Sequence, residues 1–286
     1  MNPLPPPVLD HVVVNVKGDL EASVDTYRRL GFALTERGHH SLGSSNHLAI
    51  FGENYLELLG YEAGKSTVRP DVMQAPLGLT GLCFKTPDVH GVFAALQERD
   101  IGVETPAEFF RPVHLPDGTT QDARFRTVRI ASDLVRNGRV FFCHHLTLEH
   151  VWRDEWREHP NGVTDIVGYV ISSPNPAQTA ALYNRTFGPG VLSEIGGSGY
   201  AFTAGRARVQ IVSTLNAARR FGHVETTNDG SERGVALVLR TRSLAQTEAA
   251  LRKHGVPWKT LDNGTLLVAA GDAFHVALQF VEGSMA

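Results

Sequence analysis

A pattern of one strand, one helix and several further strands recurs four times, and it constrains the fold more than any other feature of the chain. The first copy opens with LDHVVVNV (9–16), a β-branched run typical of a buried strand. Apolar residues then follow at a spacing that places them on one face of a helix: Leu20, Val24, Tyr27 and Leu30. Gly31 supplies the expected helix end. We expect this copy to finish with strands at 32–35, 47–51 and 54–61.

Three further copies keep this order of elements. They open with GLCFKT (81–86), IVGYVIS (166–172) and GVALVLR (234–240). Helices are expected at 88–99, 176–187 and 242–254. The remaining strands are expected at 103–110, 123–131, 139–145, 191–195, 200–204, 207–213, 257–261, 265–270 and 274–281. Unequal spacing between the copies indicates four divergent modules rather than a solenoid.

Three polar segments interrupt the repeats. RPVHLPDGTTQD (111–122) reads as a long insertion because it contains a cluster of turn residues. Residues 146–164 read as a connector between two paired halves, and 216–232 as a surface loop or mobile flap. We therefore divide the chain into a first half, residues 1–160, and a second half, residues 161–286.

Composition restricts the partners and the compartment. The net charge of −3, without a basic cluster, argues against binding to nucleic acid or to an anionic membrane surface. No apolar run is long enough to span a membrane. Cys83 and Cys143 each lie in an apolar run, which fits a reducing compartment, and the start MNPLPPPVLD is unlike a secretory signal. We expect a cytoplasmic protein that binds a small molecule.

Two segments resemble a known family. LDHVVVNVKGDLEASVDTYRRLGF (9–32) resembles the opening of vicinal-oxygen-chelate proteins, and FFCHHLTLEHVWRDEWREHPNG (141–162) resembles the connector of their glyoxalase-like-domain subgroup. The resemblance implies an α+β fold, with four βαβββ modules paired into two curved, cleft-forming mixed sheets with flanking helices. It also implies a divalent metal in the cleft, held from first and fourth strands, that chelates vicinal oxygens of a substrate. The superfamily includes binding proteins without catalysis.

The resemblance places His11 and Glu57 at the metal-ligand positions of the first and fourth strands. An imidazole and a carboxylate suit zinc, iron, manganese or nickel. Both residues also stand in apolar strands, and a buried carboxylate needs a metal, a cation or water as its partner. The alternative for Glu57 is a surface-facing side chain on a half-exposed sheet.

The other modules depart from this pattern. Gly81 occupies the corresponding position of the second copy, whose last strand offers His144 or His145. Alignment of RVFFCHH with NYLELLG favours His144, although a β-bulge would exchange the two. The expected set is therefore His11, Glu57 and His144, which matches ferrous oxygenases in composition. The second half is expected to be metal-free, because the matching positions hold other residues: Gly168, Gly234, Gln210 and Gln279.

Arginines are candidates for substrate recognition at the rim of the cleft. Arg111, Arg124 and Arg126 would bind a carboxylate or a phosphate through paired hydrogen bonds, unless they are solvated charges on the sheet surface. His39 and His40 lie in a polar loop and read as surface residues.

Three functions follow from these assignments. The leading hypothesis is a metal-dependent lyase, isomerase or hydrolase acting on a small oxygenated metabolite, with Glu57 moving the proton if it is not a firm ligand. The second is a binding protein without catalysis that uses the same cleft. The third is an extradiol-type dioxygenase. Paired modules within one chain are compatible with a monomer or a homodimer.

Overall fold

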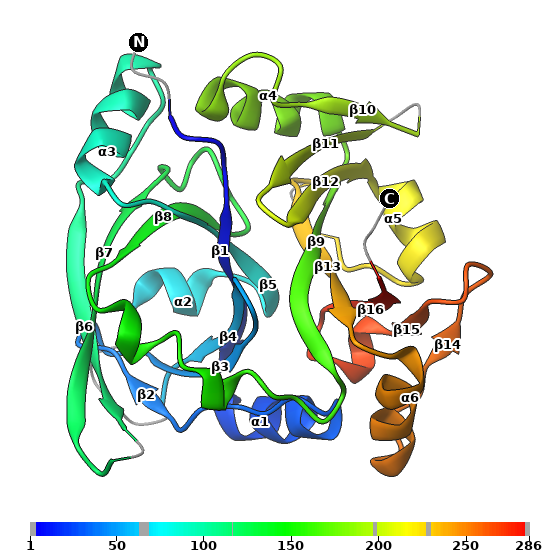
Figure 1. Ribbon diagram of the computed structural model, residues 1–286. Coiled ribbons are helices and arrows are strands. Elements are labelled where there is room, and N and C mark those ends of the chain that lie inside the picture. Colours follow the sequence, from blue (N-terminus) through cyan, green and yellow to red (C-terminus); the bar gives the residue numbers. More distant parts are fainter. Residues whose placement is uncertain (1–3, 63–68, 116, 197–198, 227–229, 284–286) are drawn as a thin grey trace.

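The computed structural model describes residues 4–62, 69–115, 117–196, 199–226 and 230–283, which form two curved, mixed eight-stranded sheets with flanking helices (Figure 1). The strand order is β2-β3-β4-β1-β5-β8-β7-β6 in the first sheet and β10-β11-β12-β9-β13-β16-β15-β14 in the second. Each sheet combines two βαβββ modules that meet at their first strands. The predicted fold class is confirmed.

The first sheet contains the first two modules. The first module comprises β1 Leu9–Lys17, α1 Leu20–Arg29, β2 Gly38–His39, β3 Ser45–Ile50 and β4 Tyr55–Gly60. The second comprises β5 Gly78–Lys85, α3 Val89–Glu98, β6 Ala107–His114, β7 Thr120–Arg129 and β8 Arg139–His145. The short helix α2, Pro70–Gln74, lies between them, and the 3₁₀ turns η1 Leu148–His150 and η2 Asp154–Trp156 follow.

The second sheet contains the other two modules. The third module comprises β9 Val163–Ser173, α4 Pro176–Phe187, β10 Ser193–Ile195, β11 Gly199–Ala204 and β12 Ala207–Ser213. The fourth comprises β13 Arg233–Thr241, α6 Leu244–Lys253, β14 Lys259–Thr260, β15 Leu266–Val268 and β16 Ala277–Glu282, with η3 at Ala270–Asp272. Helix α5, Thr214–Phe221, lies between the two modules.

Alternation along the central strands separates an outer, core-forming face from an inner face. On β1, Val12, Val14 and Val16 pack into the main hydrophobic core, whereas His11 and Val13 point into a cavity on the concave side. This main core contains residues from both halves, including Phe84 of β5 and Phe202 of β11, whose ring centroids are 6.2 Å apart. The convex faces of the two sheets therefore pack together.

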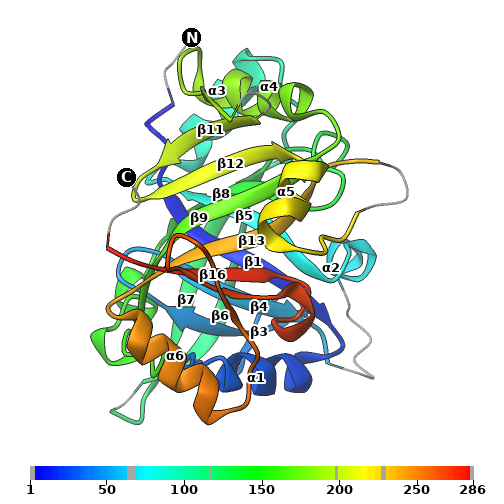
Figure 2. The same ribbon diagram turned by 90° about the vertical axis from the view of Figure 1, so that its right-hand side faces the viewer.

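Helices from the two halves are paired at both ends of the molecule. Figure 2 shows α1 beside α6 at one end and α3 near α4 at the other. Arg29 of α1 donates to the His254 carbonyl oxygen, and Arg185 of α4 donates to the Asp100 carbonyl oxygen at 2.6 Å. Asn54 also joins the halves, since its side chain accepts from the Ile166 N–H at 2.8 Å and donates to the Ile166 carbonyl oxygen at 3.0 Å.

Three local expectations were wrong. The segment 111–122 is an extension of the β6–β7 hairpin rather than an insertion, because its residues continue the antiparallel register from Arg111↔Ala123 to His114↔Thr120. The segment 216–232 begins with most of α5 instead of a loop. Residues 32–35 form no strand, and the short β2 at 38–39 takes that place in the sheet. The division at residues 160 and 161 stays a prediction.

Candidate functional site

A cavity of about 110 Å³ lies on the concave face of the first sheet. The sheet curls until its edges approach each other: the Ser41 N–H donates to the Phe110 carbonyl oxygen at 2.9 Å, and the Phe110 N–H donates to the Ser41 hydroxyl at 3.2 Å. Helix α2 packs on the same concave face, where Val72 contacts a small cluster with Val13 and Leu59. The apolar walls are formed by the following side chains: Val13, Leu42, Leu48, Tyr55, Leu59, Phe109, Phe125 and Phe141.

A β-bulge in β1 brings two adjacent polar residues to the concave side. Leu9 pairs with Phe84 and His11 with Cys83, so Asp10 is an extra residue without an opposite partner on β5. Neighbouring strand residues ordinarily point to opposite faces. Because the bulge interrupts this alternation, the carboxylate of Asp10 reaches the imidazole of His11, and both residues are buried.

Asp10 holds two imidazoles with a single oxygen atom. Its Oδ2 lies 2.8 Å from His11 Nδ1 and 2.8 Å from His145 Nε2. Burial opposes the charge on Asp10, but the two histidines outweigh it and hold the pKa of this carboxyl far below its usual range. Burial also opposes the charge on His145, yet Asp10 and Cys143 raise the pKa of this imidazole to about 10. Asp10 is thus ionised and His145 protonated at neutral pH.

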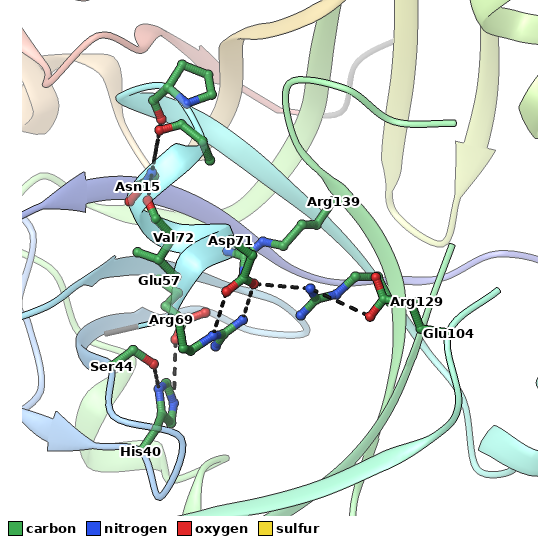
Figure 3. A network of polar contacts seen from close by, with 12 residues as sticks. Asn15, His40, Ser44, Glu57, Arg69, Asp71, Val72, Glu104, Arg129 and Arg139 are labelled. Carbon is green, nitrogen blue, oxygen red and sulfur yellow. Dashed lines mark hydrogen bonds and ion pairs between the residues drawn. The ribbon is translucent and has the colours of Figure 1, made fainter. Parts of the chain in front are cut away.

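Glu57 faces His11 across the cavity. Its Oε2 atom lies 3.9 Å from His11 Nε2, and its Oε1 atom accepts a hydrogen bond of 2.7 Å from the Asn46 amide. His40 approaches the other oxygen of the carboxylate, with Nε2 3.8 Å from Oε1. Figure 3 shows the side chains of His40 and Glu57. Burial lowers the pKa of His40 to about 3, so this ring is neutral. Burial opposes the charge on Glu57, but the surrounding imidazoles and the Asn46 amide lower its pKa below the ordinary value.

This donor set suits a divalent metal ion. When Asp10 accepts the proton of His11 Nδ1, the lone pair of Nε2 points toward Glu57, and a carboxylate behind a ligating histidine is the usual supporting contact at metal sites. Asp10, His11 and His145 also offer ligand atoms within 4.8 Å of one another, as do Asp10, Cys83 and Cys143. In the histidine cluster, Asp10 Oδ2 already lies at the hydrogen-bond distance of 2.8 Å from both rings.

The last strand of the second module presents His145, not His144, to this region. Arg139, Phe141 and Cys143 of β8 line the cavity, and His145 continues the same face. His144 points to the opposite face, so the structure does not bring it to His11 and Glu57. The ring of Phe141 instead lies near His11, with centroids 5.3 Å apart. Gly81 is opposite Val13, and a Cβ there would come within 2.4 Å of the valine side chain.

Only one of the three predicted arginines reaches the cavity. Arg111 is 3% exposed and lines it. Arg124 and Arg126 lie on the outer face of β7 and form ion pairs with Glu108. The alternation of β7 explains this difference, because Phe125, Thr127 and Arg129 occupy the inner face. Three cavity-lining arginines were not predicted: Arg69, Arg129 and Arg139.

The matching concave face of the second sheet is filled by α5. Ala217 and Phe221 of this helix pack against Val170 and Ala236, which belong to the first strands of the third and fourth modules. Arg220 donates to Gln210 Oε1 at 2.8 Å and to Gln279 Oε1 at 2.8 Å. The two glutamines occupy the positions predicted to lack a metal ligand, and a guanidinium joins them. Of the two concave faces, the one that holds the candidate site is therefore that of the first sheet.

The connector is attached to the first sheet through His159. Its Nδ1 accepts from the Ala33 N–H at 3.0 Å, and its Nε2 donates to the Ile50 carbonyl oxygen at 2.8 Å. Both ring nitrogens are thus used in structural hydrogen bonds. This histidine fixes the path of the chain between the two halves.

Several site residues escaped the sequence analysis. Asp10 is adjacent to His11 and reads as an outward-facing strand residue until the bulge is known. His40 is interpreted from the sequence as a surface residue, but its side chain is buried and lines the cavity. Arg69 and Asp71 flank a proline in a segment without periodicity. For Asp10, the sequence offers one signal, the motif DHVVV, in which a carboxylate and a histidine open an apolar strand. The sequence offers no comparable signal for the other residues.

Comparisons with known proteins agree with this architecture. The sequence profile of a family described as glyoxalase-like domain matches residues 9–187. No curated protein matches the chain. Among the residues described, no helix combines the length and apolar character needed to cross a membrane.

Solved structures with low sequence identity share the fold. A hypothetical protein from Staphylococcus aureus superposes with a TM-score of 0.66 at 13% identity, covering 96% of this chain and 99% of its own. A mutant of 4-hydroxymandelate synthase from Streptomyces coelicolor gives 0.60 at 12% identity, covering 99% and 95%. A fusion of a xylose isomerase-like TIM barrel with 4-hydroxyphenylpyruvate dioxygenase gives 0.56 at 14% identity, covering all of this chain and 51% of the fusion.

Proposed function

This chain belongs to the glyoxalase-like domain family, and we propose that it is a metal-dependent enzyme of lyase or isomerase type acting on a small oxygenated metabolite in the cavity of its first sheet. His11 and Glu57 would hold a divalent ion such as zinc, iron, manganese or nickel. The enzyme would work in the cytoplasm as a monomer or homodimer.

One observation carries this proposal. Asp10, His11 and Glu57 form a line of contacts that ends in the cavity, from Asp10 Oδ2 to His11 Nδ1 at 2.8 Å and from His11 Nε2 to Glu57 Oε2 at 3.9 Å. Keeping a carboxylate and an oriented imidazole buried costs folding free energy. Such groups are common at sites where they bind or react.

The side chains can perform a proton transfer next to a carbonyl group. If Glu57 is not a firm ligand of the ion, its carboxylate can accept a proton from a carbon atom held beside it, while the Asn46 amide fixes the orientation of this carboxylate. The aromatic rings of Tyr55 and Phe141 exclude water from His11. A bound divalent ion would polarise the substrate oxygen. In this role the carboxylate returns the proton to a neighbouring carbon or to the leaving group.

A binding protein without catalysis is the second candidate. The residues that β5 and β8 place near His11 favour this candidate, because they are Cys83 and Phe141. No imidazole or carboxylate of these two strands lines the cavity. For the dioxygenase hypothesis, the predicted set of three ligands does not come together, because His144 points away from His11 and Glu57.

Metal analysis of protein purified without a histidine tag or chelators tests the proposal. We expect about one equivalent of a divalent ion in the wild type, and loss of that ion in His11→Ala and Glu57→Gln with unchanged circular dichroism. The exposed His254→Ala is the matched control and should keep the ion. Stoichiometric metal in both cavity variants would refute the site. A wild type that takes up none of the four metals during dialysis would favour the binding protein.

A further inference from the structure

Four guanidinium groups line the cavity beside the proposed reacting groups: Arg69, Arg111, Arg129 and Arg139. Fewer carboxylates line the cavity or contact these arginines, namely Glu57, Glu104 and Asp71 of α2. Asp10, behind His11, is paired with His145. The cavity region therefore has an excess of positive charge in the part of the chain that the structure describes. An excess of buried cations favours a bound anion.

Asp71 shows how this arrangement binds a carboxylate. Figure 3 shows its side chain between three arginines. Arg69 donates to both oxygens, at 3.1 and 2.6 Å, while Arg129 and Arg139 approach Oδ2 at 3.1 and 3.4 Å. Asn15 holds α2 in place through hydrogen bonds to the carbonyl oxygens of Val72, Ala75 and Pro76. Three of the four guanidiniums are thus already neutralised in part by the protein itself.

Arg111 differs from the other three. It is 3% exposed, forms no ion pair with any described residue, and its buried Nη2 has no hydrogen-bond partner. Burial lowers the pKa of this group, although Tyr55 and Glu57 oppose that effect. Gly38 gives the side chain room, because a Cβ at that position would lie 3.0 Å from Arg111 Cδ. A buried guanidinium with a free N–H is costly unless a ligand supplies the acceptor.

We propose that Arg111 is a specificity residue that binds the oxyanion of a small organic acid, either a carboxylate or a phosphate. The aromatic walls of Phe109 and Phe125 would contact the carbon skeleton. A volume of about 110 Å³ limits that skeleton to a few carbon atoms, since a cavity of about 150 Å³ holds benzene. This assignment rests on the proposed function and narrows its substrate to small anions that also carry an oxygen group near His11 and Glu57.

Ligand-observed NMR titrations of the full chain with propionate, inorganic phosphate and the neutral propionamide test the assignment. We expect an anion to bind and propionamide to fail. The dissociation constant of that anion should rise about ten-fold or more in Arg111→Gln and less in Arg111→Lys, which keeps the charge. The outer-face variant Arg124→Gln should match the wild type. Preference for propionate or for phosphate identifies which oxyanion the site takes.

The proposal is overturned if neither anion binds, if propionamide binds as well as propionate, or if Arg111→Gln leaves the dissociation constant unchanged. Arg111→Lys keeps the test valid if Arg111→Gln does not fold. The variant His11→Ala separates the proposed metal site from the proposed anion site, because it should lose the metal and still bind the anion. Loss of anion binding in His11→Ala, with none lost in Arg111→Gln, would place the anion on the metal instead.

Discussion

The role of His11 depends on its neighbour in the sequence. Asp10 reaches His11 Nδ1 because of a one-residue bulge, and this contact leaves Nε2 available toward Glu57. A carboxylate in this position fixes the orientation and the tautomer of the ring. The same oxygen holds the protonated His145, so Asp10 has both a structural and a positioning function.

Replacing Asp10 with asparagine should weaken metal binding without removing a ligand. We expect the metal dissociation constant of Asp10→Asn to rise roughly 10- to 100-fold, because His11 loses its orienting carboxylate. Competition with a chromophoric chelator measures this change, and the exposed Asp262→Asn is the control. Unchanged affinity in Asp10→Asn would show that His11 does not depend on this contact.

Asp71 should make stability depend on pH in the acid range. Burial opposes its charge, but Arg69, Arg139 and Arg129 outweigh this cost and hold the pKa of Asp71 well below its ordinary value. A lowered native pKa stabilises the fold above the unfolded pKa, about 3.9, and this stabilisation disappears as the pH falls toward the native value.

Asp71→Asn should therefore reduce the free energy of unfolding by about 1–3 kcal/mol at neutral pH, a modest value because the side chain is 30% exposed. Urea denaturation between pH 7 and pH 2.5 gives the difference between wild type and variant. The difference should shrink below about pH 4. A constant difference over this range would contradict the arginine contacts of Asp71.

Among the elements, long apolar runs and helical periodicity were sufficient to predict most of the fold. The expected helix at 176–187 and strand at 207–213 match α4 and β12. Turn residues misled the prediction at 111–122, because pairing between β6 and β7 extends the hairpin to His114 and Thr120. Local sequence also does not show which side chains of β7 and β8 face the cavity. Strand alternation places Arg124 and Arg126 on one face of β7 and Arg129 on the other. Only the pairing of the whole sheet determines which of these two faces is concave.

Helix α5 fills the concave face of the second sheet, the face that in the first sheet holds the cavity. Its position depends on long-range packing of Ala217 and Phe221, which a polar sequence at 216–232 does not reveal. Arg220 links Gln210 and Gln279 at the metal-ligand positions of the second sheet. A charge fixed by the chain thus occupies the place where the first sheet offers His11 and Glu57.

Arg220→Ala should destabilise the protein and leave the first cavity intact. We expect the free energy of unfolding to fall by about 2–4 kcal/mol, because two buried glutamines lose a hydrogen-bond partner and packing is lost with the side chain. Urea denaturation measures this, with the exposed Arg219→Ala as control. Metal content should not change. A loss of metal in Arg220→Ala would mean that the two sheets share a site.

At the scale of the whole molecule, the two halves share one hydrophobic core. Phe84 of the first sheet contacts Phe187 of helix α4 and Phe202 of the second sheet, with the centroid of the Phe187 ring 5.0 Å away. Asn54 of the first half also forms two hydrogen bonds with the backbone of Ile166 in the second half. The sequence repeats predict the number of modules, but this packing of convex faces depends on contacts between residues more than 100 positions apart.

The shared core predicts that the first half does not fold alone. Residues 1–160 produced as a separate chain should lack a cooperative thermal transition, because Phe84 and its neighbours would face water. Calorimetry of the fragment and of the full chain makes the comparison, and the full chain should unfold in one transition. A fragment with its own sharp transition would support two independent domains divided at residues 160 and 161.

The position of a bound metal is the most direct measurement of the central claim. Crystals grown with Mn²⁺ and measured for anomalous scattering should show one peak between the Nε2 atom of His11 and the carboxylate of Glu57, within about 2.0–2.3 Å of both ligands. A peak at Asp10, Cys83 and Cys143, or in the second sheet with none at His11, would contradict the account.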